Sequence, residues 1–156
     1  MAATRDDLLA AIEAARAELD RIVSTAAEGG WSRTAYEGWT ARDLLSHVAA
    51  SSGVAGFLLA MARNPGASFS GSDEDNDKFN AQQVAERRSK TVAQVADEAR
   101  GHLDAGAERV TAASDELLSS HYRAPWGIEG PLADVIVDSL HEHLMMHLRD
   151  LAAVVA

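Results

Sequence analysis

Apolar residues recur every three or four positions in four long stretches of the sequence, a spacing that places them on one face of an α-helix. In the first stretch, Leu8, Ile12 and Leu19 lie on such a face, opposite acids and arginines. Capping residues and helix breakers mark where the stretches begin and end. The predicted long helices cover about residues 6–26, about residues 41–62, the segment from Ser89 or Thr91 to about Val110, and about residues 131–154.

The connections between these helices are rich in turn-forming residues. An Asn-Pro-Gly sequence at residues 64–66 ends the second helix, and the serine, glycine and acidic residues that follow, up to Asp77, have the composition of a loop. A capping residue, Ser72, predicts a short helix around residues 79–87. Residues 114–130 lack a helical period beyond one possible turn, so we predict a long loop there.

The number of amphipathic helices defines the fold class. Four such helices in a chain of 156 residues are most simply accommodated by a four-helix bundle, in which each helix buries its apolar face. Alanine, a strong helix former, makes up about a fifth of the sequence, while β-branched and aromatic residues are sparse. We therefore predict an all-α fold, a four-helix bundle with long connecting loops that forms a single domain over residues 1–156.

Charge and cysteine content exclude several classes of function. The net charge is −10 and the basic residues are not segregated, which disfavours nucleic-acid binding. Without cysteine, any thiol chemistry must use a thiol from outside the chain. The acidic N-terminus does not fit a signal peptide, and no apolar run reaches the roughly 18 residues of a membrane span. We expect a cytoplasmic protein whose partners are small molecules, with no nucleic acid and no membrane.

Histidines interrupt the apolar faces of two predicted helices. On the last helix, His143 and His147 lie about 40° apart around the axis, at 3.6 residues per turn. On the second helix, His47 lies near the centre of the apolar face. His141 is expected to point away, and His102 and His121 are interpreted as solvated residues, the first on a helix exterior and the second in a loop.

A shared metal ion explains the three core-facing histidines. A single histidine on an apolar face is usually a hydrogen-bonded core residue, but three buried together need a common partner. A divalent cation accepts one lone pair from each imidazole at roughly 2.0–2.1 Å. His47, His143 and His147 are therefore predicted as ligands of a divalent metal ion, and three hydrogen-bonded core histidines remain the alternative. Three imidazoles suit zinc, nickel, iron or copper alike. Of these ions we expect zinc or nickel, with iron as a further candidate.

Other side chains are candidates for supporting such a site. Asp43, one turn before His47, and Asp150, three residues after His147, are candidates to accept a hydrogen bond from a ligand imidazole. The alternative is that Asp43 is a helix-start charge and that Asp150 lies on a solvated face. Three aromatic residues near the ends of the site helices are candidate pocket walls, with ordinary core packing as the alternative. They are Trp39, Tyr122 and Trp126.

Two sequence runs carry a resemblance to a known family. GWTARDLLSHVA at residues 38–49 and HLMMHLRDL at residues 143–151, in that order and at that separation, resemble the DinB-like superfamily. That superfamily includes the metal-binding domain of mycothiol-dependent maleylpyruvate isomerase and related bacterial thiol transferases. The likeness covers nearly the whole chain, although neither run is very specific alone.

The resemblance implies a fold, a metal site and a cofactor. Its fold is a four-helix bundle, and its metal triad corresponds here to His47, His143 and His147. In the isomerase branch the first ligand of the last pair is typically glutamate, whereas this sequence has His143, as in the broader DinB group. The resemblance also implies a low-molecular-weight thiol, such as mycothiol or bacillithiol, that a metal activates to attack a small electrophile.

Two functions fit these features. In the first, the chain is a metal-dependent enzyme, a thiol S-transferase or a hydrolase, in which the ion lowers the pKa of a thiol or a water molecule. In the second, it is a non-catalytic metal-binding or stress-response bundle that acts as a homodimeric binding module, since its alanine-rich faces allow a homodimer. A fourth protein ligand would favour the second function, and an open coordination position the first.

Overall fold

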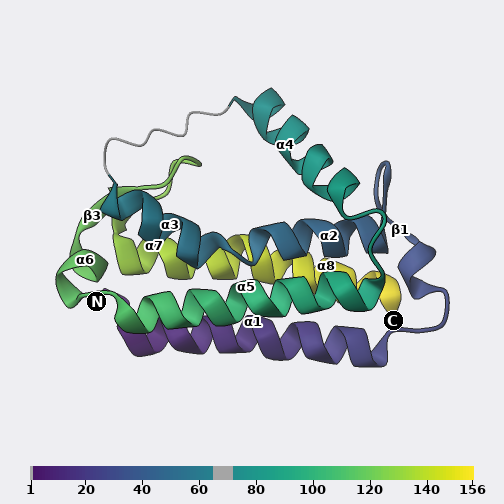
Figure 1. Ribbon diagram of the computed structural model, residues 1–156, viewed down its shortest axis with the longest axis horizontal. Helices are drawn as coiled ribbons and strands as arrows, with labels where there is room; N and C mark the ends of the chain where they lie inside the picture. The colour runs from purple at the N-terminus through teal and green to yellow at the C-terminus, as the bar shows by residue number, and fades with distance from the viewer. Residues whose placement is uncertain (1, 65–71) are drawn as a thin grey trace.

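Four helical columns lie side by side in the computed structural model, which describes residues 2–64 and 72–156 (Figure 1). Two columns are continuous helices, and each of the other two is built from consecutive segments. The prediction of an all-α four-helix bundle is confirmed. In chain order the columns are α1 (Arg5–Thr25); α2 (Ala41–Ser51) with α3 (Val54–Arg63); α5 (Val92–Ala112); and α7 (Leu132–Asp138) with the π-helical segment η2 (Ser139–Leu144) and α8 (Met145–Val155).

The apolar faces predicted from the sequence form the core. Leu8, Leu19 and Ile22 of α1 are at most 1% exposed. They belong to one buried cluster with residues of the other columns, among them Leu44 and Leu140. Each fully buried leucine or isoleucine stabilises the fold by roughly 1.5–3 kcal/mol, so this burial provides most of the free energy that holds the columns together.

Reciprocal caps begin helices at the predicted places. Thr40 Oγ1 accepts a hydrogen bond from the backbone N–H of Asp43 at 3.2 Å, and the Asp43 carboxylate accepts one from the backbone N–H of Thr40 at 3.0 Å. Thr91 forms such a cap at α5, and Ser72 does so at α4 (Asp73–Glu86). Each cap pairs backbone donors that a helix start leaves free, so these sequence signals fix where the helices begin.

The second column is not the single helix that was predicted. It bends between α2 and α3, at Ser52 and Gly53. The hydroxyl of Ser52 donates to the carbonyl oxygen of Val48 at 2.7 Å, and such a bond to the preceding turn bends a helix. The bend leaves the apolar face continuous, because Leu44 in α2 and Leu58 in α3 are both fully buried.

The prediction of a loop up to Asp77 is also wrong in its last part. Helix α4 starts at Asp73, so the acidic residues that follow Ser72 form its first turn. Negative charges stabilise a helix N-terminus, which explains why this polar run is helical. The predicted loop over residues 65–71 lies outside the described residues.

Two short antiparallel hairpins stand where only loops were predicted. The first precedes α2 and turns through Gly38, whose φ is +79°. The second follows the short helix α6 (Asp115–Ser119) and lies at the opposite end of the bundle (Figure 1). The strands are too short for an alternating pattern to predict them. They are β1 (Thr34–Tyr36), β2 (Trp39–Thr40), β3 (His121–Arg123) and β4 (Glu129–Pro131).

The first hairpin is fastened to the end of α8. Arg33 lies between the 3₁₀ turn η1 (Gly30–Ser32) and β1. Its guanidinium donates to the carbonyl oxygens of Val154 at 2.9 Å and Ala156 at 2.6 Å. Carbonyls at a helix C-terminus lack partners within the helix, so Arg33 satisfies them and holds the hairpin against α8.

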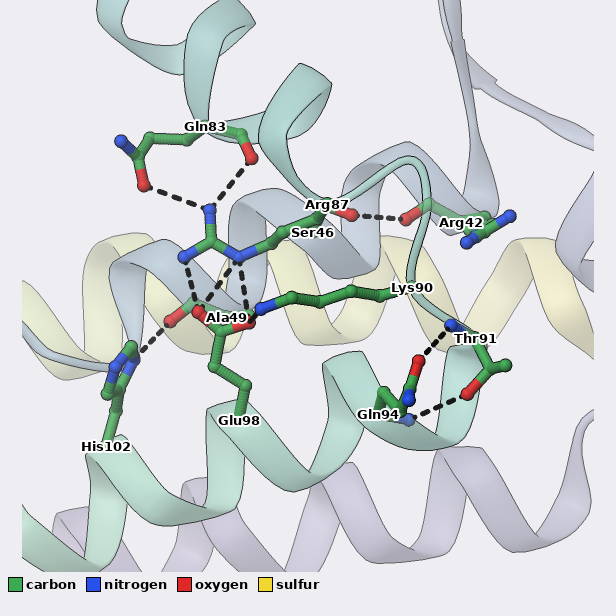
Figure 2. A network of polar contacts seen from close by, with 10 residues as sticks. All are labelled: Arg42, Ser46, Ala49, Gln83, Arg87, Lys90, Thr91, Gln94, Glu98 and His102. Atoms are coloured by element: carbon green, nitrogen blue, oxygen red, sulfur yellow. Dashed lines mark hydrogen bonds and ion pairs between the residues drawn. The ribbon is translucent and has the colours of Figure 1, made fainter.

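A polar network holds the C-terminal end of α4, which runs obliquely above the other helices (Figures 1 and 2). Arg87 is 7% exposed and donates to Glu98 of α5, with its shortest contact at 2.6 Å, and to the carbonyl oxygen of Gln83 at 2.8 Å. Lys90 donates to the same carboxylate at 3.1 Å. Within Asp73–Glu86, which the structure describes in full, Val84 alone is buried, so the network rather than apolar packing docks α4.

The interpretation of His102 as a solvated residue is wrong. His102 is half-buried, and its Nδ1 lies 2.9 Å from the carbonyl oxygen of Ala49, because the packing of α5 against α2 covers this side of the helix (Figure 2). His121 is exposed as expected, although it lies in β3 rather than in a loop.

The stretch Ala41–Arg63 is long and apolar enough to meet the criterion for a membrane span, which the sequence analysis did not anticipate. In the structure, 61% of its most apolar window is buried inside the protein. A core helix of a bundle has this property, and the packing of α2 and α3 accounts for the apolar composition.

Candidate metal centre

Three imidazole rings meet between α2 and the last column. His47 comes from α2, His143 from η2 and His147 from the first turn of α8. One nitrogen from each ring lies within 4.8 Å of the other two. His47 and His147 are 5% and 8% exposed, while His143 is exposed. The structure therefore brings together the three predicted histidines, but the expectation that all three are buried is wrong, because His143 is exposed and the cluster reaches solvent there.

The π-helical segment lies at this cluster. A π turn contains one more residue than an α turn and is often found at functional sites. Despite this irregular turn, Leu140 and Leu144 stay buried. The centroids of the His143 and His147 rings are 4.6 Å apart. The two side chains are therefore neighbours, as their spacing of four residues predicts.

Tyr36 is a site residue that was not predicted from the sequence. Its hydroxyl lies 3.0 Å from His147 Nδ1 and 2.5 Å from Asp150 Oδ2. Burial, followed by the hydrogen bond to Asp150, raises the pKa of Tyr36. Tyr36 lies on β1, and because the hairpin was not predicted, no sequence signal placed this tyrosine next to the last helix.

The two candidate acids have different roles in the structure. Asp150 lies on the site side of α8 and reaches His147 through Tyr36 rather than directly. The carboxylate of Asp43 caps α2, where Oδ2 accepts from the backbone N–H and the hydroxyl of Thr40. In the described part of the chain, His47 Nδ1 has no hydrogen-bond partner. Asp43 therefore does not support His47, and its alternative interpretation as a helix-start charge is correct.

The three candidate aromatic residues lie in different places. Trp39 packs beside His47, with ring centroids 5.5 Å apart, and so lines the cluster. Trp126 is 47% exposed, stacks on Phe57, and its Nε1 donates to Ser139 Oγ at 3.3 Å, one helical turn before His143. Tyr122 is half-buried in β3, whose hairpin lies at the opposite end of the bundle from β1 and Tyr36 (Figure 1).

The environment of the cluster favours neutral imidazoles. Burial, followed by repulsion from His147 and His143, lowers the pKa of His47 to about 4. Burial and repulsion from His143 likewise lower the pKa of His147 to about 4, against an opposing effect of Asp150. Desolvation also lowers the pKa of His143. Neutral rings offer the lone pairs that a metal ion requires, so the protein keeps all three ready at neutral pH.

The donor set fits a divalent transition-metal ion. The Nε2 atoms of His47 and His147 are 3.2 Å apart. Two nitrogens bound to one tetrahedral ion at bond lengths near 2 Å are about 3.3 Å apart, so this pair has the required separation. Imidazole nitrogens are ligands for zinc, nickel, iron and copper alike, so the donor set does not select among these ions.

Comparisons with known proteins agree with this fold. The family described as the mycothiol maleylpyruvate isomerase N-terminal domain matches residues 12–152. Crystal structures of mycothiol-dependent maleylpyruvate isomerase superpose on the chain. A histidine-to-alanine mutant has a TM-score of 0.74 at 15% identity over 96% of this chain. A second structure has a TM-score of 0.68 at 16% identity over 99% of this chain. No curated protein sequence matches significantly.

The fold, together with the family match, defines a DinB-like helical bundle. The chain belongs to the family of the mycothiol maleylpyruvate isomerase N-terminal domain. It spans 61% of the length of the isomerase chains on which it superposes. The identities are low, so the superpositions show a shared fold, and the resemblance inferred from residues 38–49 and 143–151 is confirmed at the level of the superfamily.

Proposed function

We propose that this protein is a metal-dependent enzyme in which His47, His143 and His147 hold one divalent ion and a low-molecular-weight thiol is the co-substrate. The observation that carries the proposal is the convergence of three neutral imidazoles within 4.8 Å in a chain of this family. When bound, such an ion lowers the pKa of a thiol or a water molecule toward neutrality.

The surroundings of the three histidines support a reaction rather than a purely structural site. A structural zinc site usually has four protein ligands, whereas three histidines form the cluster found in the described residues. His143 is exposed, so small molecules can reach the cluster from its side. The indole of Trp39 packs against His47, and the hydroxyl of Tyr36 contacts His147 Nδ1.

The absence of cysteine makes an external thiol necessary for any thiol transfer. The names of the family and of the superposed structures specify mycothiol, and maleylpyruvate is the substrate named for those structures. We extend this chemistry to the chain as thiol addition to a small electrophile in the site. Hydrolysis of a small substrate, with water in place of the thiol, is the second candidate reaction for the same three-histidine site.

A thiol titration tests the proposal. Protein loaded with cobalt or nickel is expected to develop a thiolate charge-transfer band when mycothiol is added, with bacillithiol and glutathione as comparisons. The zinc-loaded protein is expected to convert maleylpyruvate or another small electrophile only in the presence of the thiol. His147→Ala should abolish both results, whereas His121→Ala, which replaces an exposed histidine away from the cluster, should leave them unchanged.

A defined result would contradict the enzyme proposal. If no thiol perturbs the bound metal, and if small electrophiles and esters react no faster with the native protein than with His147→Ala, the enzyme proposal is wrong. The chain would then be a metal-binding module without catalytic function.

A further inference from the structure

Three polar groups form a line at the side of the histidine cluster. The hydroxyl of Tyr36 lies between Asp150 Oδ2, at 2.5 Å, and His147 Nδ1, at 3.0 Å. On the other edge of the same ring, His147 Nε2 lies 3.2 Å from His47 Nε2. The line therefore continues through His147 to His47.

The number of hydrogens available determines the direction of each bond in this line. A phenol carries one hydrogen, and a carboxylate can only accept. The hydroxyl of Tyr36 therefore donates to Asp150, and its oxygen accepts from His147 Nδ1–H. A neutral imidazole carries one N–H, so His147 Nε2 has a free lone pair that points at His47.

The contact between the two rings then fixes the proton on His47 as well. Two lone pairs at 3.2 Å would repel, so in the metal-free protein His47 Nε2 carries the hydrogen and donates it to His147. His47 Nδ1 is then an unprotonated acceptor, and it is the buried side-chain atom for which the described residues provide no partner. The two histidines are thus unequal: His147 has a supporting chain, and His47 has none.

We propose that Tyr36, with Asp150 behind it, is a positioning residue that holds His147 in the Nδ1–H tautomer, so that the Nε2 lone pair faces the centre of the cluster before any ligand arrives. His47, by contrast, must move its hydrogen from Nε2 to Nδ1 when Nε2 takes a ligand. The inference that these tautomers favour metal binding rests on the function proposed above. The tautomers of His47 and His147 follow from the hydrogen bonds alone.

The way Tyr36 is held supports a positioning role. Tyr36 ends β1, and the hairpin is fastened to the last turn of α8 through Arg33. Asp150 and His147 both lie on α8, so the tyrosine and its two partners are attached to one element. The ring of Tyr36 also packs against Trp39, with centroids 6.3 Å apart, and replacement by phenylalanine preserves this contact.

Nitrogen-15 NMR of the metal-free protein reads the tautomers directly, through long-range couplings from ring carbon-bound hydrogens to Nδ1 and Nε2. The native protein is expected to show a protonated Nδ1 on His147 and a protonated Nε2 on His47. In Tyr36→Phe, His147 should lose its fixed tautomer and the zinc dissociation constant should rise about 10–100-fold, as for other residues that orient metal ligands. Asp150→Asn should also weaken zinc binding. The amide of Asn can donate to the phenol oxygen, and the Tyr36 hydroxyl can then donate to His147 Nδ1 and favour the opposite tautomer.

The control is Tyr122→Phe, which removes the hydroxyl of a half-buried tyrosine in the other hairpin and should change neither the tautomers nor zinc affinity. A protonated Nε2 on His147 in the native protein, or an unchanged His147 tautomer in Tyr36→Phe, would overturn the inference. If the tautomers are as stated but the native protein binds no zinc, the positioning inference stands and the proposed function fails.

Discussion

Acidifying the metal-free protein from about pH 7.5 to about pH 5 is expected to lower its free energy of unfolding by about 4 kcal/mol, about 2 kcal/mol for each of two imidazoles. The pKa values of His47 and His147 are about 4 in the folded protein, against a model value of 6.5. Between these values the unfolded chain binds protons that the folded protein does not. The stability is therefore present above about pH 6.5 and is lost as the pH falls toward 4.

Urea unfolding followed by circular dichroism at several pH values measures this loss. The range stops at pH 5 so that protonation of carboxylates contributes little. His147→Gln should remove more than half of the pH dependence, because it removes one of the two buried imidazoles and also the repulsion from His147 that helps to lower the pKa of His47. His121→Gln, at an exposed position, should keep it in full. An equal pH dependence in the native protein and in His147→Gln would show that the cluster is not the cause.

Replacing Arg87 with methionine is expected to destabilise the protein by about 2–4 kcal/mol, because it leaves a partly buried carboxylate without its main partner. The side chains of Arg87 and Glu98 are 8% and 21% exposed, and three hydrogen bonds join them (Figure 2). Burial raises the pKa of Glu98, but the bonds from Arg87 and Lys90 outweigh it and hold this pKa below its ordinary value.

Two further variants distinguish this pair from an ordinary surface ion pair. Arg100→Met breaks contacts with Asp20 and Asp97, whose side chains are 46% and 76% exposed, and should cost less than about 1 kcal/mol. Removing both partners, in Arg87→Met with Glu98→Leu, should restore most of the lost stability, because no unpaired charge is left. Hydrogen exchange should show α4 opening first in Arg87→Met. Equal losses in Arg87→Met and Arg100→Met would contradict this account.

The parts of the structure that could be predicted are the long helices, because their apolar residues recur every three or four positions over many residues. Each helical column buries an apolar face, and His47 and His147 could be found because a buried polar residue on such a face needs a partner. His143 could be found from its spacing of four residues from His147, although it is exposed. The caps at Thr40 and Ser72 were predictable because the capping motif lies within four residues.

The parts that were missed depend on contacts between distant segments. Tyr36 and Asp150 are far apart in the sequence, and only the docking of the short hairpin formed by β1 and β2 against α8 brings them together. The π-helical segment η2 has no composition that distinguishes it from an α-helix. The position of Asp43 allowed either a hydrogen bond to His47 or a cap at the start of α2. The hydrogen bonds with Thr40 show that it is the cap.

The central claim is that His47, His143 and His147 hold one metal ion, and X-ray absorption at the zinc edge of zinc-loaded protein tests it most directly. The account predicts one zinc ion per chain, with three imidazole nitrogens at about 2.0–2.1 Å and a remaining position filled by a non-protein ligand. His147→Ala should lose stoichiometric zinc while the bundle stays helical. A native protein that retains no stoichiometric zinc, or a zinc shell without three imidazoles, would contradict the claim.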